Sequence, residues 1–420
     1  MQGALAAAVV SLAIGAIGAI GATASAAPAK PAPPPPPPAR FDDAAALGPF
    51  AAALAAQRAG TVDHPLRVAY FGDSLTADDQ ITGELRRRLQ EAVGDGGPGF
   101  VFALAPHPMC EHRAVRRSAS GGWRVNGLST TIPGDHLLGL GGSAETDDDG
   151  TVTLTPTGPV RAVDVHYLAQ PHGGALELVA DGTVVDTIAT ADEHKRAAFE
   201  RAAVPAGTKR ISLRAHGRVR LFGAALEAGS GAVVDNLGVV SGTVKQIATF
   251  DLPAHLQNQL AHRAADLVVI MYGTNEAEWL RAKGAGMEEH EKLFGELLAT
   301  VRAANPTGAC LVVSPLDQLA WREEKMPARA SIPAMVEAQR RAAHAAGCAF
   351  WDTYAWMGGA GASRDWYRKG WIVADFQHPT TAGAERIAGA LFAGLVGGTG
   401  GGTGGGTGGS ARGAGAKSSP

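Results

Sequence analysis

Hydrophobic and polar residues alternate in two different ways along the chain, and this difference divides it into parts. Before residue 123 and after residue 235, short and almost wholly apolar runs alternate with stretches whose apolar residues recur at helical spacing. The apolar runs are "LRVAYFGDS" (66–74), "ADLVVIMYG" (265–273), "CLVVSP" (310–315) and "CAFWD" (348–352). Continuous apolar strands separated by amphipathic helices are typical of a parallel sheet covered on both faces.

The helices that should cover this sheet follow the same strands. In "DDQITGELRRRLQEAV" the residues Ile81, Leu85, Leu89 and Val93 lie four apart and form one apolar stripe. Further helices are predicted near 287–304, 332–346 and 381–395. The predicted fold class is α/β, a three-layer α/β/α sandwich around a parallel sheet.

Residues 123–235 show a different pattern, in which apolar and polar residues alternate one by one. Segments such as "TVTLT", "ALELVADG" and "KRISLRAH" are short and are separated by Gly, Pro and Asp-Gly turns. This pattern predicts an antiparallel β-sandwich or jelly roll. We expect it to be inserted into a surface loop of an α/β domain made of residues 44–122 and 236–396.

The residues at the two ends of the chain are not expected to be part of these domains. Residues 1–26 are uncharged, apolar or small, and they end in Ala24-Ser25-Ala26, which predicts a signal peptide. Since a basic start is missing, an uncleaved N-terminal anchor that tethers the protein to a membrane is the alternative. Residues 27–43 form a stiff proline-rich linker, and residues 397–420 a disordered Gly/Thr-rich tail. We therefore expect a secreted, periplasmic or cell-envelope protein.

The net charge limits the possible binding partners, and the cysteine content bears on the cellular compartment. The formal net charge is −3 and no basic cluster occurs, so nucleic-acid binding is not expected. The three cysteines allow at most one disulfide. Cys310 and Cys348 each open an apolar run, so they can pair if their strands are neighbours, or they can both stay free thiols.

A serine stands at the end of the first apolar run, in "VAYFGDSLTADD" (68–79). Ser74 would lie at the C-terminal end of a parallel strand, where open α/β sheets bind ligands. A nucleophilic serine needs a base and donors for the oxyanion. In the alternative interpretation, Ser74 or Thr76 only caps a helix and Gly72 only makes a turn.

The rest of the sequence contains candidates for the base and for the oxyanion donors. Asp375 and His378 in "ADFQHPTTAGAERIAG" lie three apart before the last helix, where the carboxylate can orient the imidazole toward Ser74. Asn275 in "MYGTNEAEW" follows another strand and can donate its amide hydrogens to an oxyanion. Backbone N–H groups of Ser74 and of a glycine in "NLGVVSGTVKQ" would complete the hole.

These segments resemble the conserved blocks of the SGNH or GDSL hydrolases, since "GDSL", "YGTNE" and "DFQHPT" occur in the order of that family. The resemblance implies a flavodoxin-like fold, the catalytic residues Ser74, Asp375 and His378, and an oxyanion hole of Ser74, Gly242 and Asn275. It implies no cofactor and no metal. Because "LGVVSG" is one residue longer than the family's "LGxxG", Gly238 and Ser241 stay alternatives to Gly242.

The order of the parts is similar to a narrower group, the bacterial peptidoglycan O-acetylesterases with an inserted module like a carbohydrate-binding domain. That resemblance implies a monomeric enzyme that removes acetyl groups from peptidoglycan or another acetylated polysaccharide. A lipolytic or aryl esterase, an acyltransferase, and a non-catalytic wall-binding protein are the alternatives.

Two weaker signals accompany these blocks. Trp366 and Trp371 precede His378 and are candidates to stack on a sugar ring, or they are packing residues. His107, Cys110 and His112 imitate the spacing of metal ligands, but no second pair follows, so no metal site is expected there.

Overall fold

The computed structural model describes residues 34–249, 252–320 and 322–397. The predicted signal peptide, residues 27–33 of the predicted linker and nearly all of the predicted tail lie outside these residues. Within them, no helix is both long and apolar enough to cross a membrane. The first described segment contacts the fold, because Ala39 N–H donates to the Ala390 carbonyl and Trp356 Nε1 donates to the Pro37 carbonyl.

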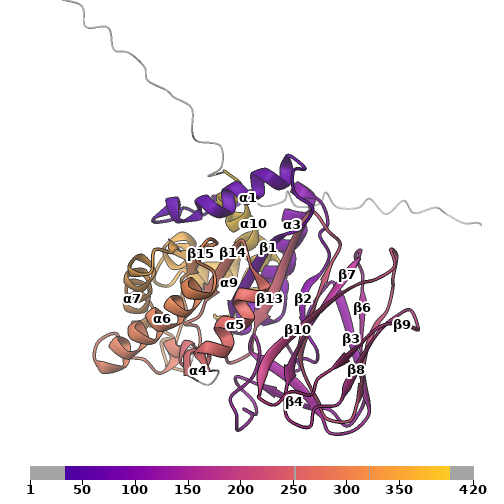
Figure 1. The fold of residues 1–420 in the computed structure, drawn as a ribbon. Helices are drawn as coiled ribbons and strands as arrows, with labels where there is room; N and C mark the ends of the chain where they lie inside the picture. The colour runs from indigo at the N-terminus through magenta and orange to yellow at the C-terminus, as the bar shows by residue number, and fades with distance from the viewer. Residues whose placement is uncertain (1–33, 250–251, 321, 398–420) are drawn as a thin grey trace, which may run out of the picture. The chain divides into compact units, whose positions relative to one another are not determined.

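A five-stranded parallel sheet forms the centre of the α/β part (Figure 1). Its spatial order is β13-β1-β14-β15-β16, and each pair of neighbours runs parallel. The strands are β1 (Leu66–Gly72), β13 (Ala232–Gly238), β14 (Leu267–Met271), β15 (Ala309–Val313) and β16 (Ala349–Trp351). This order reverses direction at β1, which makes the carboxyl ends of β1 and β14 the place where such sheets bind ligands.

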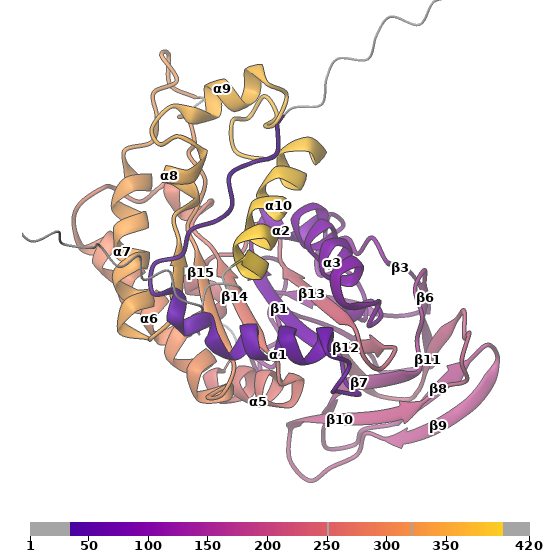
Figure 2. The ribbon, with the colours of Figure 1, turned by 90° about the horizontal axis from the view of Figure 1, so that it is seen from above.

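Helices cover both faces of this sheet, as predicted, and Figure 2 shows them on both sides of β1, β14 and β15. One apolar core joins one face of the sheet to α5, α6 and α7, and a second core joins the other face to α1, α3, α9 and α10. The helices are α1 (Gly48–Arg58), α2 (Ser74–Ala77), α3 (Gln80–Val93), α4 (Val244–Thr249), α5 (Pro253–Arg263), α6 (Ala285–Ala304), α7 (Ser331–Ala345), α8 (Thr353–Met357), α9 (Ala362–Arg368) and α10 (Thr381–Gly397), with short 3-10 turns η1 (Ala44–Leu47) and η2 (Glu276–Glu278). The α/β/α sandwich is therefore confirmed.

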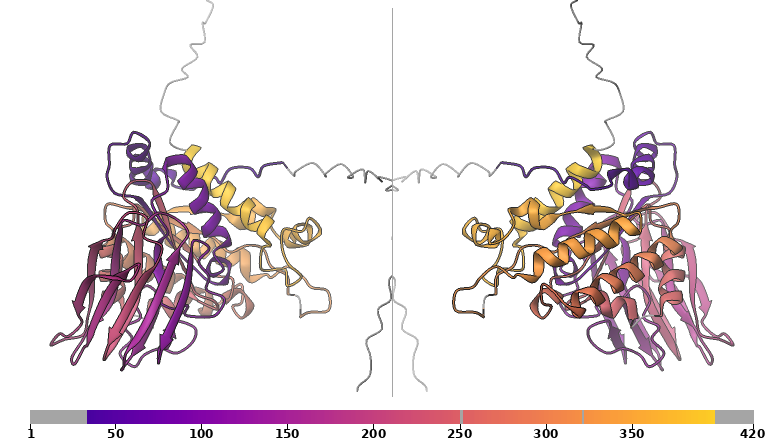
Figure 3. Two further views of the ribbon diagram at one scale, coloured as in Figure 1. Left: turned by 90° about the vertical axis from the view of Figure 1, so that its right-hand side faces the viewer. Right: turned by 90° about the vertical axis from the view of Figure 1, so that its left-hand side faces the viewer.

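Two antiparallel sheets make up the inserted β part, whose strands lie opposite the orange and yellow helices in Figure 3. The first sheet contains β2 (Gly99–Phe102), β4 (Arg124–Gly127), β5 (Gly142–Thr146), β7 (Ala162–Ala169), β10 (Arg196–Ala203) and β12 (Val219–Glu227). The second contains β3 (Val115–Gly121), β6 (Gly150–Pro156), β8 (Ala175–Ala180), β9 (Thr183–Ala189) and β11 (Ile211–His216). Their facing side chains share one apolar core, as in a β-sandwich.

Strand pairing does not change at the residues where the sequence pattern changes. β2 and β3 precede residue 123, yet they pair with the antiparallel strands β12 and β6. At the other end, β13 begins at Ala232, within the segment predicted as the insertion, and pairs with β1. β2 is short and buried throughout, and β13 is buried along its whole length, so neither strand shows a clear alternation of apolar and polar residues.

Cys310 of β15 and Cys348, directly before the neighbouring strand β16, form a disulfide. Of the two alternatives for this pair, the bridge is the one found. Cys110 is a buried free thiol.

Candidate active site

Ser74 lies one residue beyond the end of β1, after Asp73, and opens the short helix α2. The side chain of Asp73 caps this helix by accepting the Leu75 N–H at 3.0 Å, so Asp73, not Ser74, is the capping residue. Burial raises the pKa of Asp73 to about 6. The turn is tight: a Cβ at position 72 would lie 2.2 Å from Thr76 Oγ1, so only glycine fits there. The Ser74 hydroxyl is thus left available for another partner.

That partner is His378, whose Nε2 lies 2.8 Å from Ser74 Oγ. The other ring nitrogen, Nδ1, lies 2.7 Å from Asp375 Oδ2. Since a carboxylate accepts, Nδ1 carries the proton and Nε2 is free to accept the hydroxyl proton of Ser74. The structure brings the three predicted catalytic residues together in the order that nucleophilic activation requires.

The loop before α10 holds Asp375 in this position. Its Oδ1 accepts the backbone N–H groups of Gln377 and His378, at 2.9 and 3.0 Å. Burial is the largest single influence on Asp375 and opposes its charge. The hydrogen bonds from the His378 side chain and from the backbone N–H groups of His378 and Gln377 together outweigh burial and lower the pKa of this carboxyl. The same hydrogen bond raises the pKa of His378 above its ordinary value. The pair therefore favours an imidazolium, the species that forms when Ser74 gives up its proton.

Asn275 follows β14, the strand beside β1, so it reaches the same edge of the sheet as Ser74. Its Nδ2 donates to the Gly242 carbonyl at 2.8 Å. An amide nitrogen carries two hydrogens, so one of them remains for an oxyanion.

The second backbone donor of the predicted hole is not free in this structure. The Gly242 N–H donates to the Val239 carbonyl at 2.8 Å, and the Gly238 N–H donates to Asn236 Oδ1 at 3.0 Å. Ser241 lies between them with φ of 60°, a left-handed conformation, and its N–H has no hydrogen-bond partner among the described residues. The role of Gly242 stays a prediction, and it requires the bond to Val239 to be exchanged for the oxyanion.

Glu276, which the sequence analysis did not single out, fixes this turn. Its Oε1 accepts the Val244 N–H at 2.8 Å, while Asn275 holds the Gly242 carbonyl. Burial raises the pKa of Glu276 to about 7. Its position directly after Asn275 in "YGTNE" was the available signal.

The tryptophans named as sugar-stacking candidates belong to a packing cluster. Trp366 is 4% exposed, contacts Trp356 and Trp371 edge to face, and donates Nε1 to the Met357 carbonyl. Its stacking role is therefore wrong, because neither face is open to a ligand. Trp371 is half-buried, and the guanidinium of Arg386 lies 3.9 Å from its ring centre. Its stacking role stays a prediction.

A different tryptophan is exposed near the site. Trp279, at the end of η2, is 60% exposed. It lines a cavity of about 230 Å³ together with Glu276 and Thr243, the chain neighbours of Asn275 and Gly242.

His107, Cys110 and His112 do not form a metal-ligand group in the described part of the chain. The one group of that kind found there is Asp164, His166 and His262.

Fold and site together are those of an α/β protein with a serine nucleophile at the edge of its parallel sheet. Residues 206–386 match the model of the GDSL-like Lipase/Acylhydrolase family, the family that the sequence motifs resemble. The match contains Asn275, Asp375 and His378 but not Ser74, which the structure places beside His378.

Among solved structures, a peptidoglycan O-acetylesterase is similar over 81% of this chain and 93% of its own, with a TM-score of 0.69 and 24% identity. This likeness confirms the fold, including the inserted β part. An alpha/beta hydrolase enzyme from the metagenome of Lake Arreo, Spain, matches 40% of this chain and 73% of its own with a TM-score of 0.30 and 26% identity. A 4-coumarate–CoA ligase from Halorhodospira halophila is 34% identical over 82 residues, which are 19% of this chain and 21% of the ligase.

Proposed function

We propose that this acylhydrolase is an exported esterase that removes O-acetyl groups from peptidoglycan or another cell-envelope polysaccharide. The observation that carries the proposal is the contact of Ser74 Oγ with His378 Nε2, backed by Asp375. It supplies an activated nucleophile and needs no further group to act on an ester.

The reaction proceeds in two steps. Ser74 Oγ attacks the acetyl carbonyl while His378 Nε2 takes its proton, and the oxyanion accepts hydrogen bonds from Asn275 Nδ2 and the Ser74 N–H. His378 then gives the proton to the departing sugar oxygen, which leaves acetyl-Ser74. Water, activated by the same imidazole, hydrolyses this ester and releases acetate.

Two observations favour a carbohydrate polymer as the substrate. Trp279 offers an exposed ring beside the cavity next to Asn275, and aromatic rings stack well on sugar faces. The solved peptidoglycan O-acetylesterase has the same combination of a parallel sheet and an inserted β part. The Cys310–Cys348 disulfide supports export, because such bridges persist in oxidising compartments.

The test is acetate release from O-acetylated peptidoglycan, with the same polymer freed of acetyl groups by mild base as the control. We expect release by the wild type and none by Ser74→Ala. Rapid turnover of long-chain esters without acetate release from the polymer would instead indicate a lipolytic enzyme. Transfer of acetate to an added sugar would indicate an acyltransferase.

A further inference from the structure

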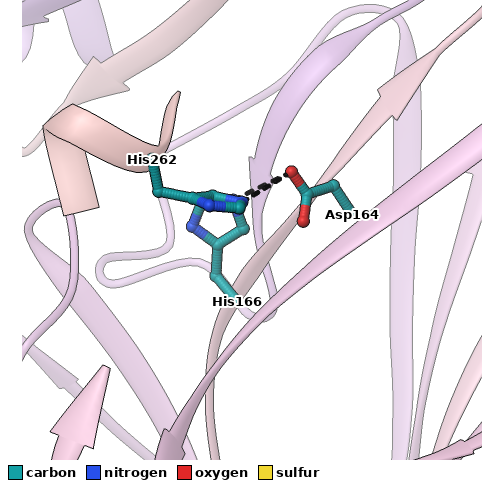
Figure 4. A group of neighbouring side chains, drawn as sticks. All are labelled: Asp164, His166 and His262. Carbon is teal, nitrogen blue, oxygen red and sulfur yellow. Dashed lines mark hydrogen bonds and ion pairs between the residues drawn. The ribbon is translucent and has the colours of Figure 1, made fainter. Parts of the chain in front are cut away.

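A second group of side chains, away from the serine, lies where the β part meets the α/β part. Asp164 and His166 stand two apart on β7, so they lie on the same face of that strand. Their neighbours Val163 and Val165 fill the core of the β-sandwich, so Asp164 and His166 point out of it. His262 and Gln259 stand three apart on α5 and share one side of that helix. Figure 4 shows Asp164, His166 and His262 converging.

The hydrogen bonds of this group leave two acceptors facing each other. His166 Nδ1 lies 3.2 Å from Gln259 Oε1, which can only accept, so Nδ1 donates and Nε2 of the neutral ring keeps a lone pair. Nε2 is buried without a hydrogen-bond partner among the described residues, and Asp164 Oδ2 lies 3.9 Å from it. The other carboxylate oxygen, Oδ1, is also buried without such a partner in the described chain. His166 Nε2 and the Asp164 carboxylate therefore face each other as acceptors, and of the two carboxylate oxygens only Oδ2 has a donor among the residues described, His262. A positive centre beside these atoms would satisfy them.

A third ligand atom completes the group. His262 Nε2 lies 2.9 Å from Asp164 Oδ2, and the ligand atoms of all three residues lie within 4.8 Å of one another. In a tetrahedral zinc site the bonds are about 2.0–2.2 Å long, so ligand atoms lie roughly 3.3 Å apart. The separations of 2.9 and 3.9 Å fall on either side of that value.

The surroundings also resemble those of a metal-binding histidine. A ligating imidazole usually donates its second ring N–H to an oxygen, as His166 does to Gln259. The rings of Phe100 and Phe199 enclose His166, while His262 is 32% exposed and leaves a route for the ion. The nearby Arg263 is already paired with Glu227 and Asp235, at 2.6 and 2.7 Å, so its charge is balanced.

The geometry points to a zinc(II) site formed by Asp164, His166 and His262, which ties β7 of the β part to α5 of the α/β part. Two imidazoles and one carboxylate suit zinc, whereas magnesium and calcium prefer all-oxygen sites. Binding replaces the hydrogen bond between His262 and Asp164, and the proton on His262 Nε2 moves to Nδ1 of the same ring. The site is independent of the esterase proposal, because no residue of the Ser74 site takes part in it.

The experiment is a titration of the full-length protein, stripped with EDTA and dialysed, with zinc chloride against a chromophoric chelator. We expect one zinc ion per chain and a melting temperature that rises with zinc concentration, since the ion binds only the folded form. Magnesium and calcium chloride should leave the melting temperature unchanged. His262→Gln and Asp164→Asn should each weaken zinc binding by at least about tenfold.

His194→Gln is the matched control, because His194 is an exposed histidine of the β part outside this group. It should bind zinc like the wild type. His262→Gln alters a side chain near the surface, so it decides the question if Asp164→Asn fails to fold. The proposal is overturned if the stripped protein takes up no zinc, or if folded His262→Gln binds it as tightly as the wild type.

Discussion

His378 Nε2 lies 2.8 Å from Ser74 Oγ, although 304 positions separate the two residues in the chain. The contact forms because β1 ends at Gly72 and α10 begins at Thr381, which brings the turn after β1 and the loop before α10 to one edge of the sheet. The hydrogen bonds of Asp375 to the loop and to the imidazole then fix the ring with Nε2 toward the hydroxyl. This contact determines the chemistry that the protein can perform.

The pH dependence of activity should reveal the role of Asp375. Its hydrogen bond raises the pKa of His378 above the ordinary 6.5, and only the neutral imidazole can accept the proton of Ser74. Activity should therefore rise with pH, with a midpoint above 6.5. In Asp375→Asn the midpoint should move to lower pH, and kcat should fall by about 10⁴ because the wrong tautomer is favoured.

The measurement is kcat/KM for p-nitrophenyl acetate across the pH range. Asp365→Asn is a suitable control, because Asp365 is an exposed aspartate of α9 that pairs with the exposed Arg368. Its profile should match the wild type. An Asp375→Asn profile that keeps the wild-type midpoint would show that Asp375 does not control the base.

Asn275→Ala should reduce kcat by about 10²–10³ and change KM little, since an oxyanion donor acts mainly in the transition state. Steady-state kinetics with p-nitrophenyl acetate measure both constants. Asn258→Ala removes an exposed asparagine from α5 and should have no effect. A large rise in KM at unchanged kcat would mean that Asn275 binds the substrate rather than the oxyanion.

Trp279→Ala should separate polymer binding from chemistry. Loss of a stacked ring costs about 0.5–1.5 kcal/mol of binding free energy, so KM for O-acetylated peptidoglycan should rise roughly 2–13-fold. The rate with p-nitrophenyl acetate should stay as in the wild type, because this ester is too small to need the ring. Equal losses of kcat/KM with both substrates would argue against a sugar-binding role of Trp279.

Glu227 joins the β part to the parallel sheet. This fully buried carboxylate of β12 accepts hydrogen bonds from Arg67 of β1 and from Arg201 and Arg263. Glu227→Gln removes a buried carboxylate charge and leaves the buried guanidinium of Arg263 with Asp235 alone, so it should lower the free energy of unfolding by about 3–5 kcal/mol. Urea denaturation measures this change.

Glu289→Gln is the matched control, because Glu289 forms an exposed ion pair with Lys245. Glu289→Gln should lower the free energy of unfolding by less than about 1 kcal/mol. Equal stabilities of the two variants would show that the buried network contributes no more than a surface pair.

The sequence predicted the α/β elements where one periodicity held over a whole segment. The runs 265–273 and 310–315 are β14 and β15, and the stripe through Ile81, Leu85 and Leu89 is the buried face of α3. β13 was missed because it is buried on both faces, so no alternation marks it, and it follows the alternating strands closely. Propensity patterns report local burial, whereas sheet membership depends on distant partners.

The difference between local patterns and distant contacts also decides which residues of the active site could be predicted. Ser74, Asn275, Asp375 and His378 stand in short motifs next to strand ends or a helix start, so their convergence was predictable. Trp366 was misassigned because nearness to His378 in the chain says nothing about which tryptophan faces solvent. The cluster of Asp164, His166 and His262 could not be predicted, because it unites a strand and a helix 98 residues apart without any shared motif.

Labelling with a fluorophosphonate tests the central claim most directly, since the reagent bonds covalently to a serine only when a base activates it. Mass spectrometry of the digested wild-type protein should show one adduct, on Ser74. His378→Ala should lose the adduct, and Ser74→Ala should lose it while keeping the wild-type melting temperature. An unlabelled wild type, or labelling that persists in Ser74→Ala, would contradict the account.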